Sequence, residues 1–430
     1  MDGVDAHMNV VHLSYSDGEG GAARAAYRLH QGLRAADVNS RMLVQFKVTD
    51  DETVISTHAR SRMGNTLARL RRSVDPAPLH VYGRYDQLDF SLGWLPESIA
   101  SQVARLSPHV VNMHWVCGGL MRIESLRRLN VPVVWTLHDM WPFTGGCHYS
   151  GGCGGYTRNC GTCPQLHSRQ QLDLSRWVWR RKHTAWADVP LTIVTPSSWL
   201  GELAKASSLF SRCRVHVIPY GLNTRVFRPV GRELARDLLG LPAAKILVVF
   251  GALTTADPRK GFQFLQPALR RLSQSDYRER IEVVIFGSAT HSLNLHGLNV
   301  RNLGTLHDDV TLALAYSAAD VTVVPSVEEN LPLVAIESLA CGTPVVSFDS
   351  TGLADLVDHR QNGYRAACFE PDDLAAGIEW VVADPERWHR LSEAARIKAE
   401  AALSLEAQAY AYARVYEEVT GTGSRGDGRA

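Results

Sequence analysis

Short runs of β-branched and aliphatic residues alternate along the chain with longer stretches whose apolar residues recur at helical spacing. In the first half, the strand-like runs begin at Asn9, Arg41, His109, Val131 and Leu191. The pattern restarts in the second half, where such runs begin at Lys245, Ile281, Asp320 and Thr343. Because strands that alternate with helices form parallel sheets through βαβ units, the sequence predicts two doubly wound α/β domains in succession.

The segment from Val217 to Pro242 has Pro and Gly at turn-forming spacing and no sustained apolar period, which is typical of a linker. We place the domain boundary near Gly221, between an N-terminal domain of residues 1–220 and a C-terminal domain of residues 221–403. Residues 404–420 predict a terminal helix that packs back on the first domain, and residues 421–430 predict a polar tail without fixed structure. Open α/β sheets bind ligands beyond the carboxyl ends of their strands, so we expect a cleft there.

Composition and charge exclude several classes of protein. Of the 430 residues, 45% are hydrophobic and 21% are charged, which excludes a collagen-like or wholly disordered chain. The formal net charge is +1, so no global field attracts a polyanion and we expect no nucleic-acid partner. No basic segment precedes the first apolar run, and the apolar run from Ile246 is far shorter than the roughly 20 residues of a membrane span. We therefore expect a soluble, cytoplasmic protein.

Two basic stretches, SRWVWRRKHTAW from Ser175 and ARSRMGNTLARLRR from Ala59, are candidates for contact with an anionic membrane surface. The alternative is that both are solvated helix faces. Neither stretch has a long, clean apolar stripe, so we prefer the solvated interpretation. Peripheral contact at the inner face of the membrane stays open, because a lipid-linked substrate would favour it.

The segment PSVEENLPLVAIESLACGTPVV, from Pro325, carries two carboxylates in a distinctive frame. A strand ends at Pro325, a loop follows with Glu329, and Pro332 stands where a helix begins. The first N–H groups of that helix lack internal partners and, with the helix dipole, favour a phosphate. Glu337 shares a helix face with apolar residues and therefore needs a partner. Taken alone, Glu337 is also explained as a structural carboxylate bound to an Arg or a backbone N–H.

Two further features suit a bound diphosphate. Gly20 and Gly21 precede a helix after the first strand. The absence of a side chain there permits a diphosphate to approach the backbone closely. The alternative is that the pair only forms a tight turn, which is the more common role of two such glycines. Lys260, in DPRKGF, is one of only six Lys residues in the chain. Its charge would neutralise a leaving diphosphate, whereas a lone Lys in a loop is usually a solvated charge.

These segments together resemble the family-4 retaining glycosyltransferases of the GT-B fold, in which two Rossmann-like domains face a central cleft. The resemblance rests on the spacing of Glu329 and Glu337 around a Leu-Pro, followed by SLACGTPVV. It extends to GEGGAARAAYRL, DPRKGF, VIPYGLNTRVFRP and YSAADVTVVPS, in the order that the family shows them. Within the family, VNMHWV and TLHDMWPFTGGC are most similar to enzymes that build cell-surface polysaccharide, including the colanic-acid type.

The resemblance implies a hexosyltransferase that moves a sugar from a nucleotide diphosphate donor, with retention, to a glycan, a lipid-linked or a small-molecule acceptor. It places Glu329 against the donor sugar hydroxyls and Glu337 against the ribose, which suits ionised carboxylates because they accept from two vicinal hydroxyls. It also implies that no enzyme nucleophile and no catalytic metal is needed. The remaining donor-binding positions that it implies are Gly20, Gly21, Arg259, Lys260, Asn330, Leu331, Leu333 and Val334.

His138 closes a strand in WTLHD, and the family carries a His there that reaches the donor sugar. A neutral imidazole can donate one hydrogen bond to a sugar oxygen, so the resemblance makes His138 a catalytic candidate beside Glu329 and Lys260. A lone His at a strand end is otherwise more often structural. His114 and Asp139 are weaker candidates for the acceptor side.

The chain departs from the family at two places. The family usually has an Arg directly after the strand-end Gly, where this chain has Ala252, and Arg259 is the candidate substitute. In the linker, Tyr220 and Asn223 stand where the family has Asn and Asp. The alternatives to polysaccharide synthesis are therefore a non-catalytic relative that binds sugar nucleotides or glycans, a sugar-nucleotide epimerase, and a transferase that decorates a natural product.

Four cysteines crowd into one Gly-rich segment that begins nine residues after His138, namely Cys147, Cys153, Cys160 and Cys163. The last two have the two-residue gap of a zinc knuckle, and the glycines permit the turns that aim thiolates at one ion. Four Cys would make a closed, structural zinc site that orders a loop. Reduced thiols or disulfides are the alternatives, and we favour zinc because the expected compartment is reducing.

Overall fold

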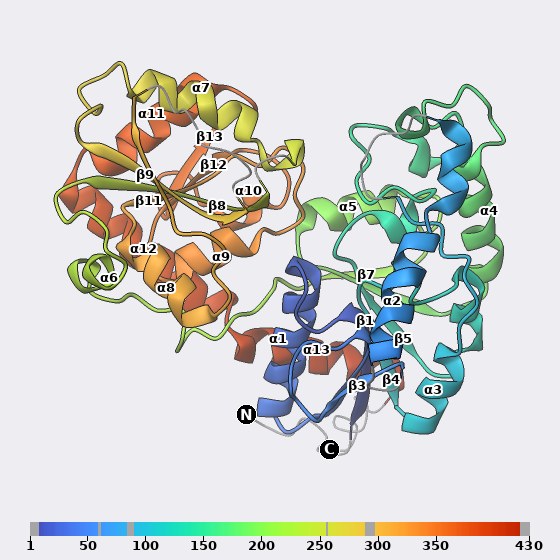
Figure 1. Ribbon diagram of the computed structural model, residues 1–430. Helices are drawn as coiled ribbons and strands as arrows, with labels where there is room; N and C mark the ends of the chain where they lie inside the picture. The colour runs from blue at the N-terminus through green and yellow to red at the C-terminus, as the bar shows by residue number, and fades with distance from the viewer. Residues whose placement is uncertain (1–7, 59–61, 84–89, 255–256, 289–296, 422–430) are drawn as a thin grey trace, which may run out of the picture. The chain divides into compact units, whose positions relative to one another are not determined.

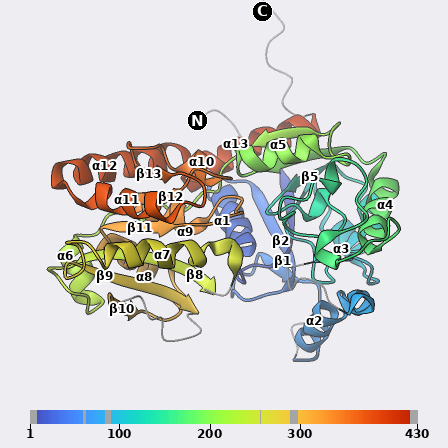
Figure 2. The same ribbon diagram turned by 90° about the horizontal axis from the view of Figure 1, so that it is seen from above.

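The structure is a computed structural model that describes residues 8–58, 62–83, 90–254, 257–288 and 297–421 (Figure 1). The chain forms two compact units. The first unit comprises Met1–Gly221 with Gln408–Ala430, and the second comprises Leu222–Ala407. Both units are parallel α/β sheets with helices on both faces (Figure 2), so the prediction of two doubly wound domains is confirmed.

The first unit contains a seven-stranded parallel sheet in the order β3-β2-β1-β4-β5-β6-β7. Its strands are β1 Asn9–Ser16, β2 Asn39–Phe46, β3 Val54–Ser56, β4 Val110–Met113, β5 Val133–Thr136, β6 Leu191–Thr195 and β7 Arg214–Val217. Its helices are α1 Gly21–Ala35, α2 Arg62–Val74, α3 Ile99–Leu106, α4 Leu174–Trp186, α5 Ser198–Ala206 and most of α13 Leu405–Thr420. Short 3₁₀ turns are η1 Ala77–Tyr82, η2 Ile123–Arg128, η3 Trp141–Phe143, η4 Gly155–Thr157 and η5 Pro164–Leu166.

Alternate residues of the strands build two cores, one on each face of this sheet. Val11 and its neighbours on one face pack with α3, α4 and α5. Val10 and its neighbours on the other face pack with α1 and α13. Two hydrogen bonds fix α13 to the sheet, because the Asn112 amide donates to the Tyr416 hydroxyl at 2.7 Å and the hydroxyls of Thr136 and Tyr412 lie 2.9 Å apart. The terminal helix is thereby part of the first unit.

The second unit contains a six-stranded parallel sheet in the order β10-β9-β8-β11-β12-β13. Its strands are β8 Ile246–Thr254, β9 Ile281–Ser288, β10 Asn299–Asn302, β11 Val321–Val324, β12 Val345–Phe348 and β13 Gly363–Ala366. Its helices are α6 Arg232–Leu238, η6 Pro258–Lys260, α7 Phe262–Leu272, α8 Asp309–Ala318, α9 Leu333–Ala340, α10 Leu353–Leu356, α11 Pro371–Val382 and α12 Pro385–Ala402. Buried side chains of α7 and α11 cover one face of the sheet, and α9 contacts β11 and β12.

The segment interpreted as a linker contains a helix that the apolar pattern did not indicate. Within residues 217–242, α6 spans Arg232–Leu238. The helix is held by a buried Arg236 instead of an apolar stripe. Its guanidinium pairs with Asp320 at 2.7 Å and donates to the carbonyls of Ala318, Ala243 and Lys245. A pattern search for apolar periodicity could not detect such an anchor.

Parts of two sequence expectations lie outside the described residues. These are nine residues of the predicted tail, 422–430, and the start of the basic stretch that begins at Ala59. The other basic stretch forms α4. Among the helices of the described residues, none combines the length and the apolar character that crossing a bilayer requires.

Candidate active site

Glu329 and Lys260 come together in the second unit. Lys260 ends the η6 turn that follows β8, and Glu329 lies in the loop that follows β11. Because β8 and β11 are neighbouring parallel strands, the loops after them emerge at the same edge of the sheet. The Nζ of Lys260 lies 2.6 Å from the Oε2 of Glu329, with side chains 27% and 16% exposed. The two residues that the sequence singled out for this unit's chemistry thus form a partly buried ion pair.

A glycine fixes the approach of these two loops. Gly261 has φ +73°, and a Cβ at this position would lie 1.7 Å from the carbonyl oxygen of Pro325. No residue with a side chain fits there without moving the backbone. The backbone N–H of Val327 also donates to the carbonyl of Arg259 at 2.7 Å. The glycine that follows Lys260 is therefore what allows the Lys260 loop to rest against the loop of Glu329.

Arg259, the candidate substitute for the missing Arg, lies beside Lys260 and forms an ion pair with a neighbouring residue of the same loop. Its guanidinium pairs with Asp257 at 2.8 Å, and its backbone N–H donates to the same carboxylate at 3.0 Å. Ala252 lies within β8, and its side chain is outside the described residues. The role of Arg259 toward a diphosphate stays a prediction.

Glu337 is almost fully buried, with 2% exposure, on α9. Its Oε2 accepts a hydrogen bond at 3.0 Å from the hydroxyl of Tyr316, a fully buried residue of α8. A tyrosine hydroxyl is thus one of the partners of this carboxylate, and the expected partnership with an Arg or a backbone N–H stays a prediction. Around the start of α9, Asn330 and Leu331 are buried.

Leu333 and Val334 are half-buried in the first turn of α9. Pro332 is the residue before the first helical one, and no side chain caps the helix. The first backbone N–H groups of α9 therefore donate no hydrogen bond to a capping side chain, and phosphate binding at this helix end stays a prediction. The structure brings these residues into one unit with Glu329 and Lys260.

Gly20 and Gly21 lie in the first unit, at the start of α1 after β1. Gly20 has φ +88°, which explains why the position is a glycine. A Cβ on Gly20 would meet nothing within 4 Å, so the end of this helix is open. Both glycines are exposed, and their contact with a diphosphate stays a prediction.

Three histidines and a tyrosine form a continuous row in the first unit. The Nδ1 of His12 lies 2.9 Å from the Nε2 of His114, and the Nδ1 of His114 lies 3.0 Å from the Nε2 of His138. The Nδ1 of His138 lies 2.6 Å from the hydroxyl oxygen of Tyr220. All four residues are buried, and their successive rings are 5.2 to 5.4 Å apart. Both ring nitrogens of the predicted catalytic His138 are therefore engaged inside the protein.

Sheet register explains this row. β1, β4 and β5 are neighbours, with His12 opposite Asn112 and Asn112 opposite Val134. His114 follows Asn112 by two residues, and His138 follows Val134 by four. Each histidine thus lies one step of two residues further toward the carboxyl end than its neighbour. Since side chains two apart point to the same face, the rings meet in a diagonal line.

Burial lowers the pKa of each of these rings. The pKa of His138 falls to about 4, and those of His12 and His114 lie well below 6.5, with desolvation as the first cause in all three. All three imidazoles are therefore neutral near pH 7, and each carries a single ring proton.

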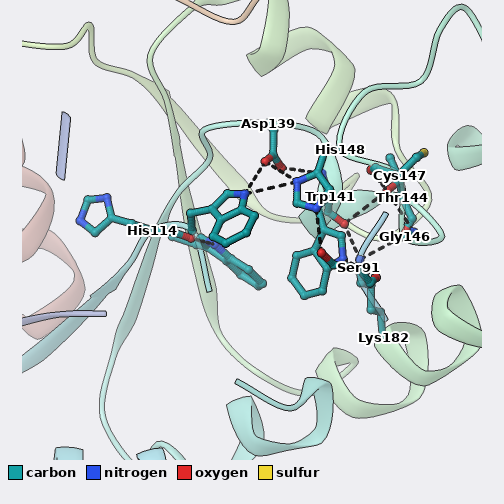
Figure 3. A network of polar contacts seen from close by, with 11 residues as sticks. Ser91, His114, Asp139, Trp141, Thr144, Gly146, Cys147, His148 and Lys182 are labelled. Carbon is teal, nitrogen blue, oxygen red and sulfur yellow. Dashed lines mark hydrogen bonds and ion pairs between the residues drawn. The ribbon is translucent and has the colours of Figure 1, made fainter. Parts of the chain in front are cut away.

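Asp139, a predicted acceptor-side residue, is also engaged with neighbouring groups (Figure 3). Its Oδ2 lies 2.6 Å from the Nδ1 of His148 and 2.9 Å from the indole Nε1 of Trp115, and its Oδ1 accepts from the backbone N–H of Trp141. The Nε2 of His148 in turn lies 2.9 Å from the hydroxyl of Ser91. The carboxylate holds the loop after β5, and a contact between Asp139 and an acceptor stays a prediction.

The four clustered cysteines line one small cavity of about 20 Å³. No disulfide joins them. Backbone N–H groups of Gln165 and Leu166 point at the sulfur of Cys163, and that of Gly155 donates to Cys153 Sγ at 3.4 Å. Burial raises the pKa of the Cys160 thiol to about 12. Across the described parts of the chain, no three His, Cys, Asp or Glu side chains are arranged to share a metal ion as they stand.

A buried lysine supports the loop that leads to these cysteines. Lys182 of α4 is fully buried and donates to the carbonyls of Trp141 and Thr144 (Figure 3). Its Nζ also lies 3.7 Å from the centre of the Trp141 ring, a cation–π contact. Burial lowers the pKa of Lys182 to about 7. The loop is thus held from its interior side by α4.

The sequence patterns did not single out His12 or Tyr316, and Tyr220 stood out only as a departure from the family. A signal for His12 exists, because HL, MH and LH recur near the ends of three strand-like runs. Tyr316 had no such signal, since its link to Glu337 depends on how α8 packs beside α9.

Comparison with known proteins gives two family matches. Residues 19–226 match the model described as Glycosyltransferase Family 4, and residues 244–384 match the model described as Glycosyl transferases group 1. One curated relative, a D-inositol 3-phosphate glycosyltransferase of Thermobispora bispora, is 33% identical over 220 residues, covering 48% of this chain and 50% of the relative. Another of that description from Catenulispora acidiphila is 34% identical over 219 residues, covering 47% and 50%. The chain thus spans about half the length of the curated relatives that it matches.

Solved structures with the same fold cover nearly the whole chain. Sucrose-phosphate synthase from Thermosynechococcus elongatus superposes with a TM-score of 0.68 at 20% identity, over 97% of this chain and 100% of that one. Anabaena HepE in complex with UDP and glucose superposes with a TM-score of 0.62 at 15% identity, over 95% and 99%. At these identities the likeness establishes the fold.

Proposed function

Because the chain belongs to the group 1, family 4 glycosyltransferases of the GT-B fold, we propose that it transfers a sugar from a nucleoside diphosphate donor with retention of configuration. The observation that carries this proposal is the Lys260–Glu329 pair at the carboxyl edge of the second sheet, beside the start of α9. A cation, a carboxylate and a helix N-terminus are the groups that a diphosphate and a sugar with vicinal hydroxyls require.

In the proposed reaction, the bond from the anomeric carbon to the phosphate oxygen breaks and a bond from that carbon to the acceptor oxygen forms on the same face. The acceptor proton passes to the leaving diphosphate. Lys260 balances the charge that develops on this diphosphate, where electrostatic stabilisation is most effective. Glu329 accepts hydrogen bonds from the donor sugar, and the buried Glu337, oriented by Tyr316, accepts from the ribose hydroxyls.

The donor and the acceptor are proposed from the relatives. The Anabaena HepE structures contain UDP, glucose and UDP-glucose, so UDP-glucose is the first donor to test. The curated relatives are named for D-inositol 3-phosphate, which belongs in the acceptor panel beside glycans and lipid-linked sugars. Synthesis of a cell-surface polysaccharide of the colanic-acid type, in the cytoplasm, remains the proposed setting, and peripheral membrane contact is the alternative to an enzyme without membrane contact. Decoration of a natural product and donor binding without transfer are the alternatives.

Thermal shift against UDP, GDP, ADP, dTDP and their common sugars tests the proposal, because a ligand that binds only the folded state raises its apparent stability. We expect one base to stabilise the protein selectively, and Glu337→Ala to weaken the shift. Glu282→Ala is the matched control, since Glu282 is another buried carboxylate of the second unit and pairs with Arg301 at 2.9 Å. We also expect slow donor hydrolysis that is lost in Glu329→Gln. A folded sample that binds none of the nucleotides would overturn the proposal.

We further propose that the four clustered cysteines bind one structural zinc ion. The support is that their side chains line a single cavity and that backbone N–H groups are aimed at the sulfurs of Cys153 and Cys163. Such donors stabilise thiolates, which are the form that zinc binds. Four Cys ligands would leave no open position, so the ion would order the loop and take no part in transfer.

A further inference from the structure

A cavity of about 460 Å³ in the first unit is lined by one face of α4 and by the η2 turn. Its size lies within the range of about 300–1,000 Å³ that small-molecule sites have. Residues three or four apart on a helix share one face, and this is the spacing of the lining residues of α4. The lining includes Arg176, Trp177, Arg180, Arg181 and Thr184 of α4, Glu124 and Arg127 of η2, and Leu172.

An ion pair makes one wall of this cavity rigid. The Nε of Arg181 lies 2.6 Å from one oxygen of Glu124, and its Nη2 lies 2.8 Å from the other. The same guanidinium donates to the carbonyls of Leu92 and Gly93 at 3.0 and 2.9 Å. The ring of Trp177 lies against it, with the guanidinium carbon 4.4 Å from the ring centre, and the residue is still 42% exposed. The cavity therefore presents an indole that is held in place.

The other cations of the cavity are not compensated within the protein. Among the described residues, no acidic side chain pairs with Arg127, Arg176 or Arg180. The Nε of Arg176 is buried and has no hydrogen-bond partner in the described part of the chain. A buried donor without an acceptor is costly, so a ligand that supplies the acceptor would relieve it. Arg176 and Arg180 are one helical turn apart, with Cβ atoms about 6 Å from each other, so both can reach one anion.

We propose that this cavity binds an acidic saccharide, a chain of sugars with ring carboxylates, as part of the acceptor. The C–H face of a pyranose ring is apolar and stacks on the indole of Trp177, whose π face attracts polarised C–H bonds. The guanidiniums of Arg176 and Arg180 donate to the carboxylate, a partner that matches their planar geometry. As a statement about the acceptor, this inference rests on the proposed sugar transfer, although the binding itself needs no donor.

The shape of the cavity favours a sugar over a lipid surface or an acidic peptide. A bilayer surface is flat, whereas this site is hollow, and the Trp177 ring that would have to enter the lipid lies against the charged Arg181. An acidic peptide supplies the charge without a rigid ring for the indole. Each unit of a uronic acid chain supplies both a ring and a carboxylate.

Isothermal titration calorimetry of the full chain tests the ligand class. We expect a trimer of galacturonic acid or of glucuronic acid to bind. Its methyl ester, which keeps the rings without the charge, and a trimer of glutamate, which has the charge without the rings, should each bind at least about tenfold more weakly. Equal binding of these probes, or failure of both uronate trimers to bind, would overturn the proposal. Binding to phosphatidylglycerol vesicles but to neither uronate trimer would also overturn it and would identify a lipid surface.

Two adjacent arginines of η2 give a matched pair of variants. Arg127 and Arg128 are both exposed, but only Arg127 lines the cavity. We expect Arg127→Gln to weaken binding of the uronate trimer about two- to fivefold, the usual effect of one exposed charge, and Arg128→Gln to leave it unchanged. Equal affinities of the two variants would overturn the assignment of the ligand to this cavity.

Arg176 provides a test that separates binding from a structural role. Because its Nε has no partner in the described part of the fold, Arg176→Met should not lower the melting temperature, while affinity for the uronate trimer should fall at least about tenfold. Unchanged affinity would overturn the proposal. If the trimer binds as expected but the protein binds no sugar nucleotide, the proposed function fails and the saccharide site stands. Donor hydrolysis without uronate binding would remove this inference alone.

Discussion

The ammonium of Lys260 lies 2.6 Å from the carboxylate of Glu329, so the two groups proposed to bind opposite ends of a sugar diphosphate are in contact with each other. Each satisfies the other's charge in a partly buried position. A diphosphate would compete for Lys260 and release the oxygens of Glu329 for the sugar hydroxyls. Donor binding is therefore an exchange of partners for both side chains.

This exchange of partners predicts that the loss of Lys260 affects catalytic activity much more than the stability of the fold. We expect Lys260→Ala to lower kcat for transfer or donor hydrolysis by about 10²- to 10³-fold, as removal of a preorganised charge does. The free energy of unfolding should fall by less than about 1 kcal/mol, since the pair is partly exposed. Lys205→Ala is the control, because it removes a more exposed ion pair of similar length, with Glu202 at 2.8 Å in α5. Equal loss of activity in both variants would refute the assignment of Lys260.

The contact of Gly261 with Pro325 predicts that the spacing of these two loops depends on one glycine. In Gly261→Ala the new Cβ would collide with the carbonyl of Pro325, and the residue would keep an unfavourable positive φ. We expect a loss of about 2–5 kcal/mol in the stability of the second unit, together with loss of donor binding.

The variant Gly240→Ala separates the effect of the steric collision from the effect of the backbone strain. Gly240 also has a positive φ, of +61°, but a Cβ there would meet nothing within 4 Å. It should therefore cost only the backbone strain of about 1–2 kcal/mol and leave donor affinity unchanged. Chemical denaturation and nucleotide titration of both variants measure the difference, and equal losses would show that the collision has no role.

The sequence predicts the two sheets well, because parallel strands buried on both faces read as continuous apolar runs. β1, β4, β8 and β11 fall on such runs. β3, β7, β10 and β13 were missed; exposed positions interrupt the apolar run in β7 and β10, and β3 and β13 have only three and four residues. The helix at Arg236 was missed because one buried cation anchors it.

The residues of the candidate site also fall into two groups, those that local motifs predict and those that only the fold brings together. Lys260, Glu329 and Glu337 were identified from local motifs with fixed spacing. The partners of these residues were not predictable, because Tyr316 reaches Glu337 only through the packing of α8 beside α9. The row of His12, His114 and His138 depends on strand order and register, which a single sequence does not give.

Buried neutral histidines predict a loss of stability in weak acid. Burial lowers the pKa of His30 and of His138 to about 4, and it also lowers those of His12 and His114 well below 6.5. The unfolded chain protonates these rings below about pH 6.5 while the native state does not, so stability is complete above that pH and declines as the pH falls. Each ring contributes a slope of up to about 1.4 kcal/mol per pH unit.

Tryptophan fluorescence can follow this loss in the first unit, because eight of the ten Trp residues lie within residues 1–221. We expect the unfolding midpoint to fall steadily between pH 6.5 and 5. His30→Asn should reduce the slope, because it removes one of the buried rings whose pKa is lowered. A midpoint that is constant over this range would contradict the neutral state of the buried rings.

The basic stretch in α4 predicts weak or absent membrane binding. Trp177 is 42% exposed and Leu172 76% exposed, but the guanidinium of Arg181 lies 4.4 Å from the Trp177 ring and pairs with Glu124 at 2.6 Å. Part of the positive charge is thus compensated within the protein. We expect no flotation with vesicles of anionic lipid at about 0.15 M salt, where screening is strong. Flotation that Trp177→Ala abolishes would instead support docking on the membrane by α4.

The proposed zinc site predicts that metal content and loop order change together. Because an ion would bind four thiolates in a closed site, we expect protein purified under reducing conditions to contain one zinc per chain by elemental analysis. Cys160→Ser should lose the zinc and lower the melting temperature, whereas Cys368→Ser should keep it, since Cys368 is exposed and outside the cluster. Four thiols that titrate freely in the unchanged, folded protein, with no zinc present, would refute the site. A mass lower by about two hydrogens per bond would instead identify disulfides.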